Sequence, residues 1–442
     1  MRSLRCLAVL LLMGAAASAQ IPDSPDANIS NIPVNYTEAK VVQYTLPDPL
    51  KLSNGEPVRD AATWFEKRRP ELIKLFEENQ YGRVPATAPK VTWQVLSTDP
   101  NALEGKAIMK QLAGRMGGPD GPAIDATLYV PAKAGKPAPV LINLTFSFGP
   151  PRGRGRAART PMAPPATVMA QAAPARGNAP AAPARGRGGP MMMRNVAADM
   201  IAHGFGYATI NYNSIEPDTL EGIKANLARG LALAQGRTEP APDEWGAIAS
   251  WAWGISRLVD YLETEPGVDA KRIAITGCSR LGKTVMWAGA RDTRIAMVID
   301  SCSGEGGSAI SRRNYGETVG HLVAKGRFPY QFCANYAKWA DKVNEMPVDA
   351  HMLAALIAPR PLLIQTGTTD IWSDPYGMFL AAVGAEPVYK LLGKEGLGTA
   401  KMPPAGDPIL HTVGFLMHEG GHGMVDTDWD VFIRFMEMHL KP

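Results

Sequence analysis

The chain has 442 residues, with 46 lysines and arginines against 42 aspartates and glutamates, which gives a formal net charge of +4. This near balance gives no reason to expect a nucleic-acid partner or binding to an acidic membrane surface. Hydrophobic residues make up 45% of the chain, enough for one large α/β domain or two ordinary domains with a sizeable core.

The first 19 residues are typical of a secretory signal peptide. Arg2 and Arg5 form a basic region, residues 6–16 form a short apolar stretch, and residues 17–19 form an Ala-Ser-Ala cleavage site. The apolar stretch is too short to span a bilayer unaided, and no other apolar run in the sequence reaches that length. We therefore expect an exported protein, periplasmic or secreted, that has no membrane anchor.

Export permits disulfide bonds, and three cysteines follow the predicted signal peptide. An odd number allows at most one bridge and leaves one free thiol. Cys278 and Cys302 each end an apolar, strand-like run, so they are candidates for a pair, whereas Cys333 has no obvious partner. Small buried hydrophobic residues are an equally good interpretation of all three, so the pairing stays open.

The first half of the chain contains one predicted helix and three predicted strands. Residues 61–79 have helical spacing of apolar side chains, and Pro70 begins a new turn within them. Residues 91–97 and 126–130 are predicted strands. Residues 140–146 are almost continuously apolar, which is typical of a central parallel strand buried on both faces.

Residues 149–193 differ in composition from the rest of the chain. They consist mainly of alanine, proline, arginine and glycine, with seven arginines between Arg152 and Arg187. Such a segment cannot bury enough apolar surface to offset the entropy lost on ordering it. We interpret it as a disordered insertion in a loop, and favour a solvated loop over an arm that binds acidic polysaccharide or nucleic acid.

Strands and helices alternate through the remainder of the chain. Residues 244–263 are predicted to form a helix that leads into a strand at residues 273–277, and a second helix follows directly. The other predicted elements are strands at residues 207–211, 296–300, 361–365 and 413–417 and a helix at residues 428–440. This alternation predicts a mostly parallel central sheet with helices on both faces, a three-layer αβα sandwich.

Ser279 stands at the corner between the strand at residues 273–277 and the helix that follows. Gly277 precedes it by two residues, as in the Gly-x-Ser-x-Gly nucleophile elbow, but Leu281 replaces the second glycine, which comes one residue later at Gly282. A structural serine in an ordinary turn is the simpler interpretation. As an elbow, the turn would place the hydroxyl at the carboxyl edge of the sheet, where open α/β sheets bind substrates.

A serine nucleophile needs a histidine as its base, and on this architecture the histidine follows the serine along the chain. His422 is the preferred candidate because it lies in a glycine-rich loop between the last predicted strand and the last helix. His418, four residues earlier, is the rival, and a packing role is its alternative interpretation.

The histidine in turn needs a carboxylate to hold it. Asp370 is the first acidic residue after the strand at residues 361–365, which makes it the preferred acid. Glu305, after the preceding strand, is the second candidate. Asp374, beside Pro375, is interpreted as a turn or cap residue.

The nucleophile motif extends beyond the serine, as Gly-Cys-Ser-Arg-Leu-Gly-Lys at residues 277–283. The motif, the segments below and the His422 loop resemble the glucuronoyl esterases of carbohydrate esterase family 15, bacterial type, in the α/β-hydrolase superfamily. The resemblance covers most of the chain beyond the signal peptide, apart from the insertion. The other matching segments are residues 68–71, 81–85, 245–254, 311–317 and 370–375.

The resemblance implies one α/β-hydrolase domain over residues 20–442 that acts as a serine esterase. Its substrates would be esters between 4-O-methyl-glucuronic acid of glucuronoxylan and lignin alcohols, cleaved through an acyl-enzyme on Ser279. His422 would be the base, and Arg280 with its backbone N–H would stabilise the oxyanion. The residues that it implies for sugar contacts are Lys283, Glu317 and Trp372.

One position departs from the family pattern. Many members place a glutamate acid where this chain has Cys302, so the acid role falls on Asp370, which matches the bacterial-type site, with Glu305 as the alternative. Two other functions stay open: an esterase for acetyl or feruloyl groups, and a non-catalytic polysaccharide-binding homologue. We expect no metal or cofactor, because no His, Cys and Asp cluster has ligand spacing along the sequence. We also expect a monomer.

Overall fold

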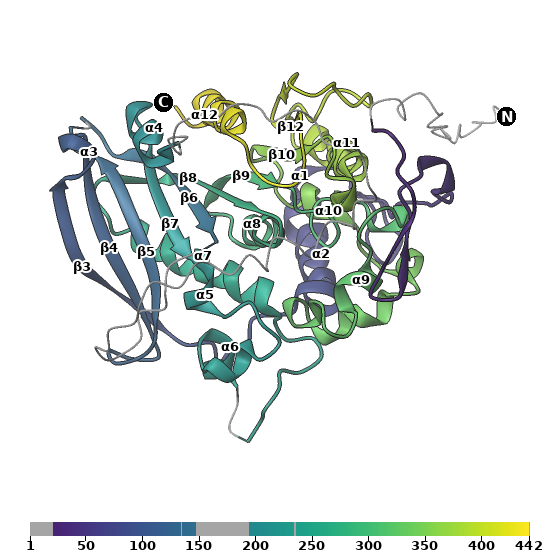
Figure 1. Cartoon of the computed structure of the whole chain (residues 1–442), viewed down its shortest axis with the longest axis horizontal. Helices are drawn as coiled ribbons and strands as arrows, with labels where there is room; N and C mark the ends of the chain where they lie inside the picture. The colour runs from purple at the N-terminus through teal and green to yellow at the C-terminus, as the bar shows by residue number, and fades with distance from the viewer. Residues whose placement is uncertain (1–20, 134, 147–193, 234–235, 442) are drawn as a thin grey trace, which may run out of the picture.

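The computed structural model describes residues 21–133, 135–146, 194–233 and 236–441. The predicted signal peptide and the predicted insertion at residues 149–193 lie outside the described residues. A ten-stranded sheet runs through the molecule in the order β11-β12-β10-β9-β8-β6-β7-β5-β4-β3 (Figure 1). Its strands are β3 (Val91–Asn101), β4 (Ala107–Met116), β5 (Ala123–Pro131), β6 (Ala138–Thr145), β7 (Gly206–Asn211), β8 (Val268–Cys278), β9 (Ile295–Ser301), β10 (Leu362–Gly367), β11 (Ile409–Leu410) and β12 (Val413–His418).

A separate two-stranded hairpin, twelve labelled helices and short 3-10 and π-helical segments complete the described structure, with π-helical segments Trp64–Arg68 and Glu77–Tyr81 on either side of the helix Arg69–Phe76. The hairpin pairs β1 (Ala27–Ile29) with β2 (Ile32–Val34). Among the described helices, none combines the length and apolar character needed to cross a bilayer. The helices are α1 (Ala61–Thr63), α2 (Arg69–Phe76), α3 (Ala102–Gly105), α4 (Val196–Ala202), α5 (Tyr212–Ile215), α6 (Ala228–Ala232), α7 (Ala247–Leu262), α8 (Arg280–Arg291), α9 (Val319–Val323), α10 (Ala350–Ala355), α11 (Pro375–Leu391) and α12 (Asp426–Leu440).

The centre of the sheet is parallel and its two edges are antiparallel. The neighbours β12, β10, β9, β8, β6 and β7 all pair in parallel. At one edge β11 runs antiparallel to β12, and at the other edge β7, β5, β4 and β3 form an antiparallel ribbon. The parallel strands point their carboxyl ends to one edge, where active sites of this architecture form.

Side chains that alternate along the central strands divide the core into two layers. Ile142 and Ile275 pack with α7, α8, α10 and α11, whereas Leu141 and Ala274 pack with α4 and α12. Figure 1 shows α4 and α12 along the upper side of the sheet and α7 below it. The predicted three-layer αβα sandwich with a mostly parallel centre is therefore confirmed.

Several elements were not among the predicted ones, and two of them show why a sequence signal can be weak. Strand β4 carries polar residues at Lys110, Gln111 and Arg115, which break the apolar alternation expected of a strand. Helix α11 contains Pro387, a residue that interrupts a helical pattern. Both elements form because tertiary packing outweighs local preference.

Candidate active site

Strand β8 ends directly before Ser279, and α8 begins at the next residue. Ser279 has φ 61° and ψ −127°, a conformation that residues other than glycine rarely adopt. Its backbone N–H donates to the carbonyl of Ser301 at the end of β9 at 2.8 Å. This strained strand-to-helix corner has the geometry of a nucleophile elbow, which lifts the hydroxyl above the sheet edge.

Both glycines of the motif, including the displaced Gly282, have a steric explanation. A Cβ at Gly277 would lie 2.6 Å from the carbonyl oxygen of Leu281, so the turn needs glycine there. A Cβ at Gly282 would lie 2.5 Å from Asp300 Oδ1 and 2.7 Å from the Ser301 carbonyl oxygen. Gly282 therefore lets α8 pack closely against the end of β9.

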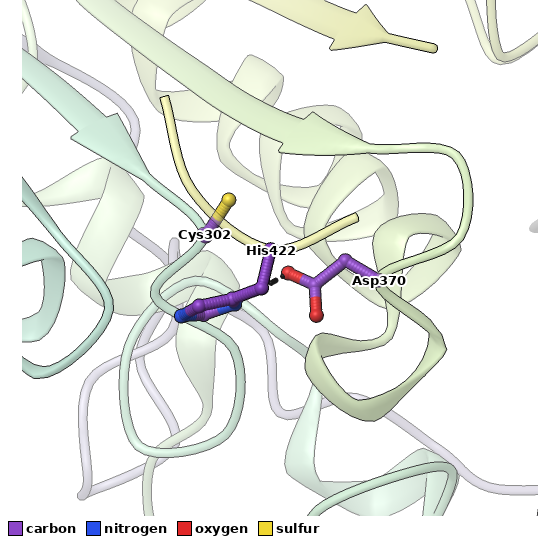
Figure 2. A group of neighbouring side chains, drawn as sticks. All are labelled: Cys302, Asp370 and His422. Carbon is purple, nitrogen blue, oxygen red and sulfur yellow. Dashed lines mark hydrogen bonds and ion pairs between the residues drawn. The ribbon is translucent and has the colours of Figure 1, made fainter. Parts of the chain in front are cut away.

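His422 and Asp370 meet at the carboxyl edge of the sheet. His422 Nδ1 lies 2.8 Å from Asp370 Oδ2 (Figure 2). The Asp370 side chain is 3% exposed and the His422 side chain 43% exposed, so one ring edge remains open to solvent. The loops that carry them approach closely because Gly367 has no Cβ; a Cβ there would lie 2.3 Å from the Gly421 carbonyl oxygen.

The pKa of His422 is set by two opposing effects. Burial lowers the pKa, but the hydrogen bond and the negative charge of Asp370 outweigh it, so the pKa is raised above its ordinary value. A carboxylate bonded to Nδ1 also holds the proton on that nitrogen and leaves Nε2 free to act as a base.

Contacts through the end of β9 place His422 near the Ser279 corner. The Ser279 N–H donates to the Ser301 carbonyl, and the next residue, Cys302, contacts the backbone of Gly423, which follows His422. The hydrogen bonds among the described residues do not include one between Ser279 and His422. In ligand-free hydrolases this bond is often long and tightens when substrate binds.

The rival histidine and the alternative acid have other partners. His418 is buried, with Nδ1 2.9 Å from Asp428 Oδ2. Glu305 is buried as well, and its Oε1 accepts hydrogen bonds from the hydroxyls of Ser311 at 2.6 Å and Tyr336 at 2.9 Å. Burial raises the pKa of Glu305 to about 8. The structure thus joins His422 to Asp370, while Glu305 is held elsewhere.

Asp374 and Cys302 also have defined places. Asp374 caps α11 by accepting the N–H of Gly377 at 2.9 Å, as expected of a cap residue. Cys302 follows β9 with φ 48°, and its Sγ lies 3.4 Å from the backbone nitrogen and 3.3 Å from the carbonyl oxygen of Gly423. Cys302 therefore contacts the backbone directly beside His422.

The three cysteines in the described part of the chain are free thiols, so none of them forms a disulfide there. Cys278 pairs with Ser301 across β8 and β9, so Cys278 and the next residue, Cys302, lie close together, as predicted. The neighbouring Cys302 thiol, against the opposing effect of burial, lowers the pKa of Cys278. Cys333 is buried in a different part of the structure, where its backbone N–H bonds the carbonyl of Gln80.

Arg280 is fixed by a carboxylate that the sequence patterns did not indicate. Its Nη1 donates to Asp218 Oδ2 at 2.5 Å, and its guanidinium lies 4.7 Å from the ring centroid of Phe328. The other Asp218 oxygen accepts hydrogen bonds from Tyr330 at 2.7 Å and Gln331 at 2.9 Å. The sequence signal that could have indicated Asp218 is its position after β7, on the segment that leaves the carboxyl edge of the sheet.

The structure brings the three predicted sugar contacts together beside α8. Lys283 Nζ donates to the Ser303 carbonyl at 2.6 Å and lies 3.9 Å from Glu317 Oε2, and the Glu317 N–H donates to the Trp372 carbonyl at 2.8 Å. Burial lowers the pKa of Lys283, although Glu317 opposes that shift. Arg327, which was not predicted, donates to Glu317 Oε1 at 2.8 Å and lies 5.4 Å from the Trp372 ring centroid.

Fold and site together define an α/β-hydrolase with a nucleophile elbow. A family model described as "Glucuronyl esterase, fungi" matches residues 240–393, a range that contains the elbow, Glu317 and Asp370. Carbohydrate esterase MZ0003, from an unknown prokaryotic organism, is 38% identical over 98% of this chain and 98% of that protein. A 4-O-methyl-glucuronoyl methylesterase of Cerrena unicolor is 28% identical over 85% of this chain and 67% of that protein.

Solved structures give the same result. A glucuronoyl esterase from Solibacter usitatus is 42% identical, with a TM-score of 0.77 over 91% of this chain and 100% of that chain. A promiscuous CE15 esterase from a marine bacterial metagenome is 37% identical, with a TM-score of 0.76 over 92% of this chain and 100% of that chain. The chain belongs to carbohydrate esterase family 15, the glucuronoyl esterases, and is a carboxylic ester hydrolase, as the resemblance predicted.

Proposed function

We propose that the protein hydrolyses esters of glucuronic acid through an acyl-enzyme on Ser279. The observation that carries this proposal is the position of two groups of residues at one sheet edge. The Asp370–His422 pair lies near the Ser279 corner, and α8 leads from that corner to Lys283, Glu317 and the loop of Trp372.

Acylation begins when the Ser279 hydroxyl attacks the ester carbonyl carbon. His422 Nε2 takes the hydroxyl proton as the new C–O bond forms, and Asp370 stabilises the resulting imidazolium through its bond to Nδ1. The carbonyl oxygen becomes an oxyanion, and the Arg280 guanidinium with the first N–H groups of α8 stabilises it.

The intermediate collapses with loss of the alcohol, which takes the proton from His422. Water then enters, gives a proton to His422 and attacks the acyl carbon, so that the uronate is released and the Ser279 hydroxyl is restored. Asp370 stays ionised throughout both steps. The observation that supports this is its bond to Nδ1, whereas Nε2 is the nitrogen that reacts.

Recognition of the sugar fits the residue types around α8. Lys283 donates hydrogen bonds, Glu317 accepts them, and Trp372 offers a half-buried flat ring suited to the face of a pyranose. Arg327, stacked near that ring and paired with Glu317, adds a further donor at the same place. We propose that these residues bind the hydroxyl groups of the glucuronoyl ring.

We further propose that the natural esters join 4-O-methyl-glucuronic acid of glucuronoxylan to lignin alcohols. The support is the activity of relatives, a 4-O-methyl-glucuronoyl methylesterase among them. The basic and apolar N-terminal segment supports action in the periplasm or outside the cell. The protein would act there as a monomer, without nucleic acid or membrane as a partner.

The test compares hydrolysis of a methyl glucuronate ester with hydrolysis of an acetyl ester of a sugar, by the wild type and by Ser279→Ala. We expect the wild type to prefer the glucuronate ester and Ser279→Ala to lose about 10⁴-fold or more in kcat. Equal rates for the two proteins would contradict catalysis by Ser279. Preference for the acetyl ester would contradict the substrate class and favour a broader substrate range, like that of the promiscuous CE15 esterase from the marine metagenome.

A further inference from the structure

Three side chains with different ligand atoms meet where the loops after β9, β10 and β12 converge. A nitrogen of His422, a carboxylate oxygen of Asp370 and Sγ of Cys302 all lie within 4.8 Å of one another (Figure 2). These residues are far apart in the sequence. The expectation of no metal site was based on spacing along the sequence, whereas the fold brings the three together from separate loops. Cys302 and Asp370 are buried, while His422 is exposed.

The chemistry of this set selects a particular class of cation. A thiolate is a soft ligand and imidazole an intermediate one, a combination that suits Zn²⁺ and excludes a preference for Mg²⁺ or Ca²⁺. Cys, His and Asp ligands hold zinc in a tetrahedron whose ligand atoms lie roughly 3.3–3.8 Å apart. The His422 loop contains Gly420, Gly421 and Gly423, so it has the freedom to contract by that amount.

We propose that Cys302, Asp370 and His422 form a binding site for Zn²⁺ or a similar soft divalent cation, and that its occupation inhibits the enzyme. Binding releases the Cys302 thiol proton to solvent and forms a metal–thiolate bond. Water fills the fourth position, or Cys278 does after losing its own thiol proton, since Cys278 pairs with Ser301, the residue before Cys302.

Inhibition follows from either mode of imidazole binding, and this part rests on the proposed role of His422. A cation on Nδ1 displaces the single proton of the neutral imidazole from the nitrogen that faces Asp370, and that proton moves to Nε2, which can then no longer accept one from Ser279. A cation on Nε2 occupies the base directly. In both cases the cation is an inhibitor and takes no part in the reaction.

Direct binding is measured first, on phosphine-reduced protein. Zn²⁺ titration by calorimetry is expected to give one site per chain, and Co²⁺ is expected to give a thiolate-to-metal charge-transfer band. Cys302→Ser should bind Zn²⁺ at least about tenfold more weakly, because losing a direct ligand costs no less than losing an outer partner. Cys333→Ser is the matched control, since Cys333 is also a buried free thiol. This substitution should leave the Zn²⁺ affinity unchanged.

The zinc K-edge absorption spectrum of the loaded wild type needs no variant, and it should show sulfur together with nitrogen and oxygen ligands. A spectrum without sulfur, or equal Zn²⁺ affinity of Cys302→Ser and the wild type, would overturn the site.

Activity is measured separately, before and after one equivalent of Zn²⁺ and again after chelation. Loss and recovery of ester hydrolysis supports inhibition, whereas full activity of the zinc-loaded enzyme overturns it. Metal-free protein that hydrolyses no glucuronate ester refutes the proposed function and leaves the binding result intact.

Discussion

Asp370 carries the charge that sets the behaviour of His422. Its carboxylate is buried in the loop that follows β10 and is bonded to Nδ1 of His422. A buried negative charge next to an imidazole favours the imidazolium, which is the form that the proposed mechanism requires when His422 takes the serine proton. The same interaction must therefore appear in the pH dependence of the enzyme.

We predict that kcat/KM for a glucuronate ester falls in acid as His422 gains a proton and loses its function as a base. Because Asp370 raises the pKa of His422, the midpoint should lie above the ordinary value of 6.5. Asp370→Asn removes the charge, so the midpoint should move to lower pH and the rate should fall about 10⁴-fold. A pH–rate profile of both proteins checks this, and an unmoved midpoint in the variant would contradict the role of Asp370.

Asp218 is predicted to be a positioning residue for Arg280. Asp218→Asn keeps the shape of the side chain but weakens its hold on the guanidinium, so kcat should fall by up to about 10²-fold with little change in KM. Asp269→Asn provides a matched control, because Asp269 also pairs with an arginine, Arg272, on another part of the structure. Steady-state kinetics that show only a higher KM for Asp218→Asn would argue against this role.

The junction of β8 and α8 shows how an element positions the site. Helix α8 can start directly at the serine only if its first turn lies against the end of β9, and Gly282 provides that space. Leu281 is fully buried in the core, which explains why this chain has leucine at the position where the usual motif has its second glycine.

We predict that Gly282→Ala destabilises the fold by about 1–3 kcal/mol, because the added methyl group overlaps Asp300 and Ser301. Urea denaturation measures the change in the free energy of unfolding. Gly320→Ala in α9 serves as the control, since a Cβ there meets no atom nearer than 3.6 Å. Equal stabilities of the two variants would show that α8 does not need this close approach.

In the molecule as a whole, buried acids couple the fold to pH, and the pKa of Glu305 is shifted upward more than that of Asp300. Burial raises the pKa of Glu305 from 4.5 to about 8, so between these values the folded protein binds a proton that the unfolded chain has released. The contribution of Glu305 to the free energy of unfolding must therefore fall as pH rises from about 4.5 to about 8, and level off above that range.

Glu305→Gln is predicted to reduce this pH dependence and to stabilise the protein at pH 8. The amide oxygen can still accept from Ser311 and Tyr336, but the side chain carries no charge that burial would penalise. Thermal unfolding at several pH values measures the effect. Glu104→Gln, at a carboxylate that is 89% exposed, should keep the wild-type slope; the same slope in Glu305→Gln would contradict the prediction.

Local patterns in the sequence were sufficient for the strands of the parallel centre, for α7, α8 and α12, and for the serine corner, but not for β4 or α11. Ser279, Asp370 and His422 could be named because each follows a recognisable strand toward the same edge of the sheet. The contacts of Asp218 and Arg327 could not be predicted, because they depend on which loops the folded sheet brings together. The position of Cys302 beside the His422 loop, on which the zinc proposal rests, could not be predicted for the same reason.

The proposed mechanism requires Ser279 to carry the uronoyl group during catalysis. His422→Ala, mixed with an aryl ester of glucuronic acid and quenched in acid, should retain a covalent intermediate because water is no longer activated for deacylation. Peptide mapping by mass spectrometry measures where the group is attached. We predict a glucuronoyl adduct on Ser279; no adduct, or an adduct on the adjacent Cys278, would contradict this mechanism.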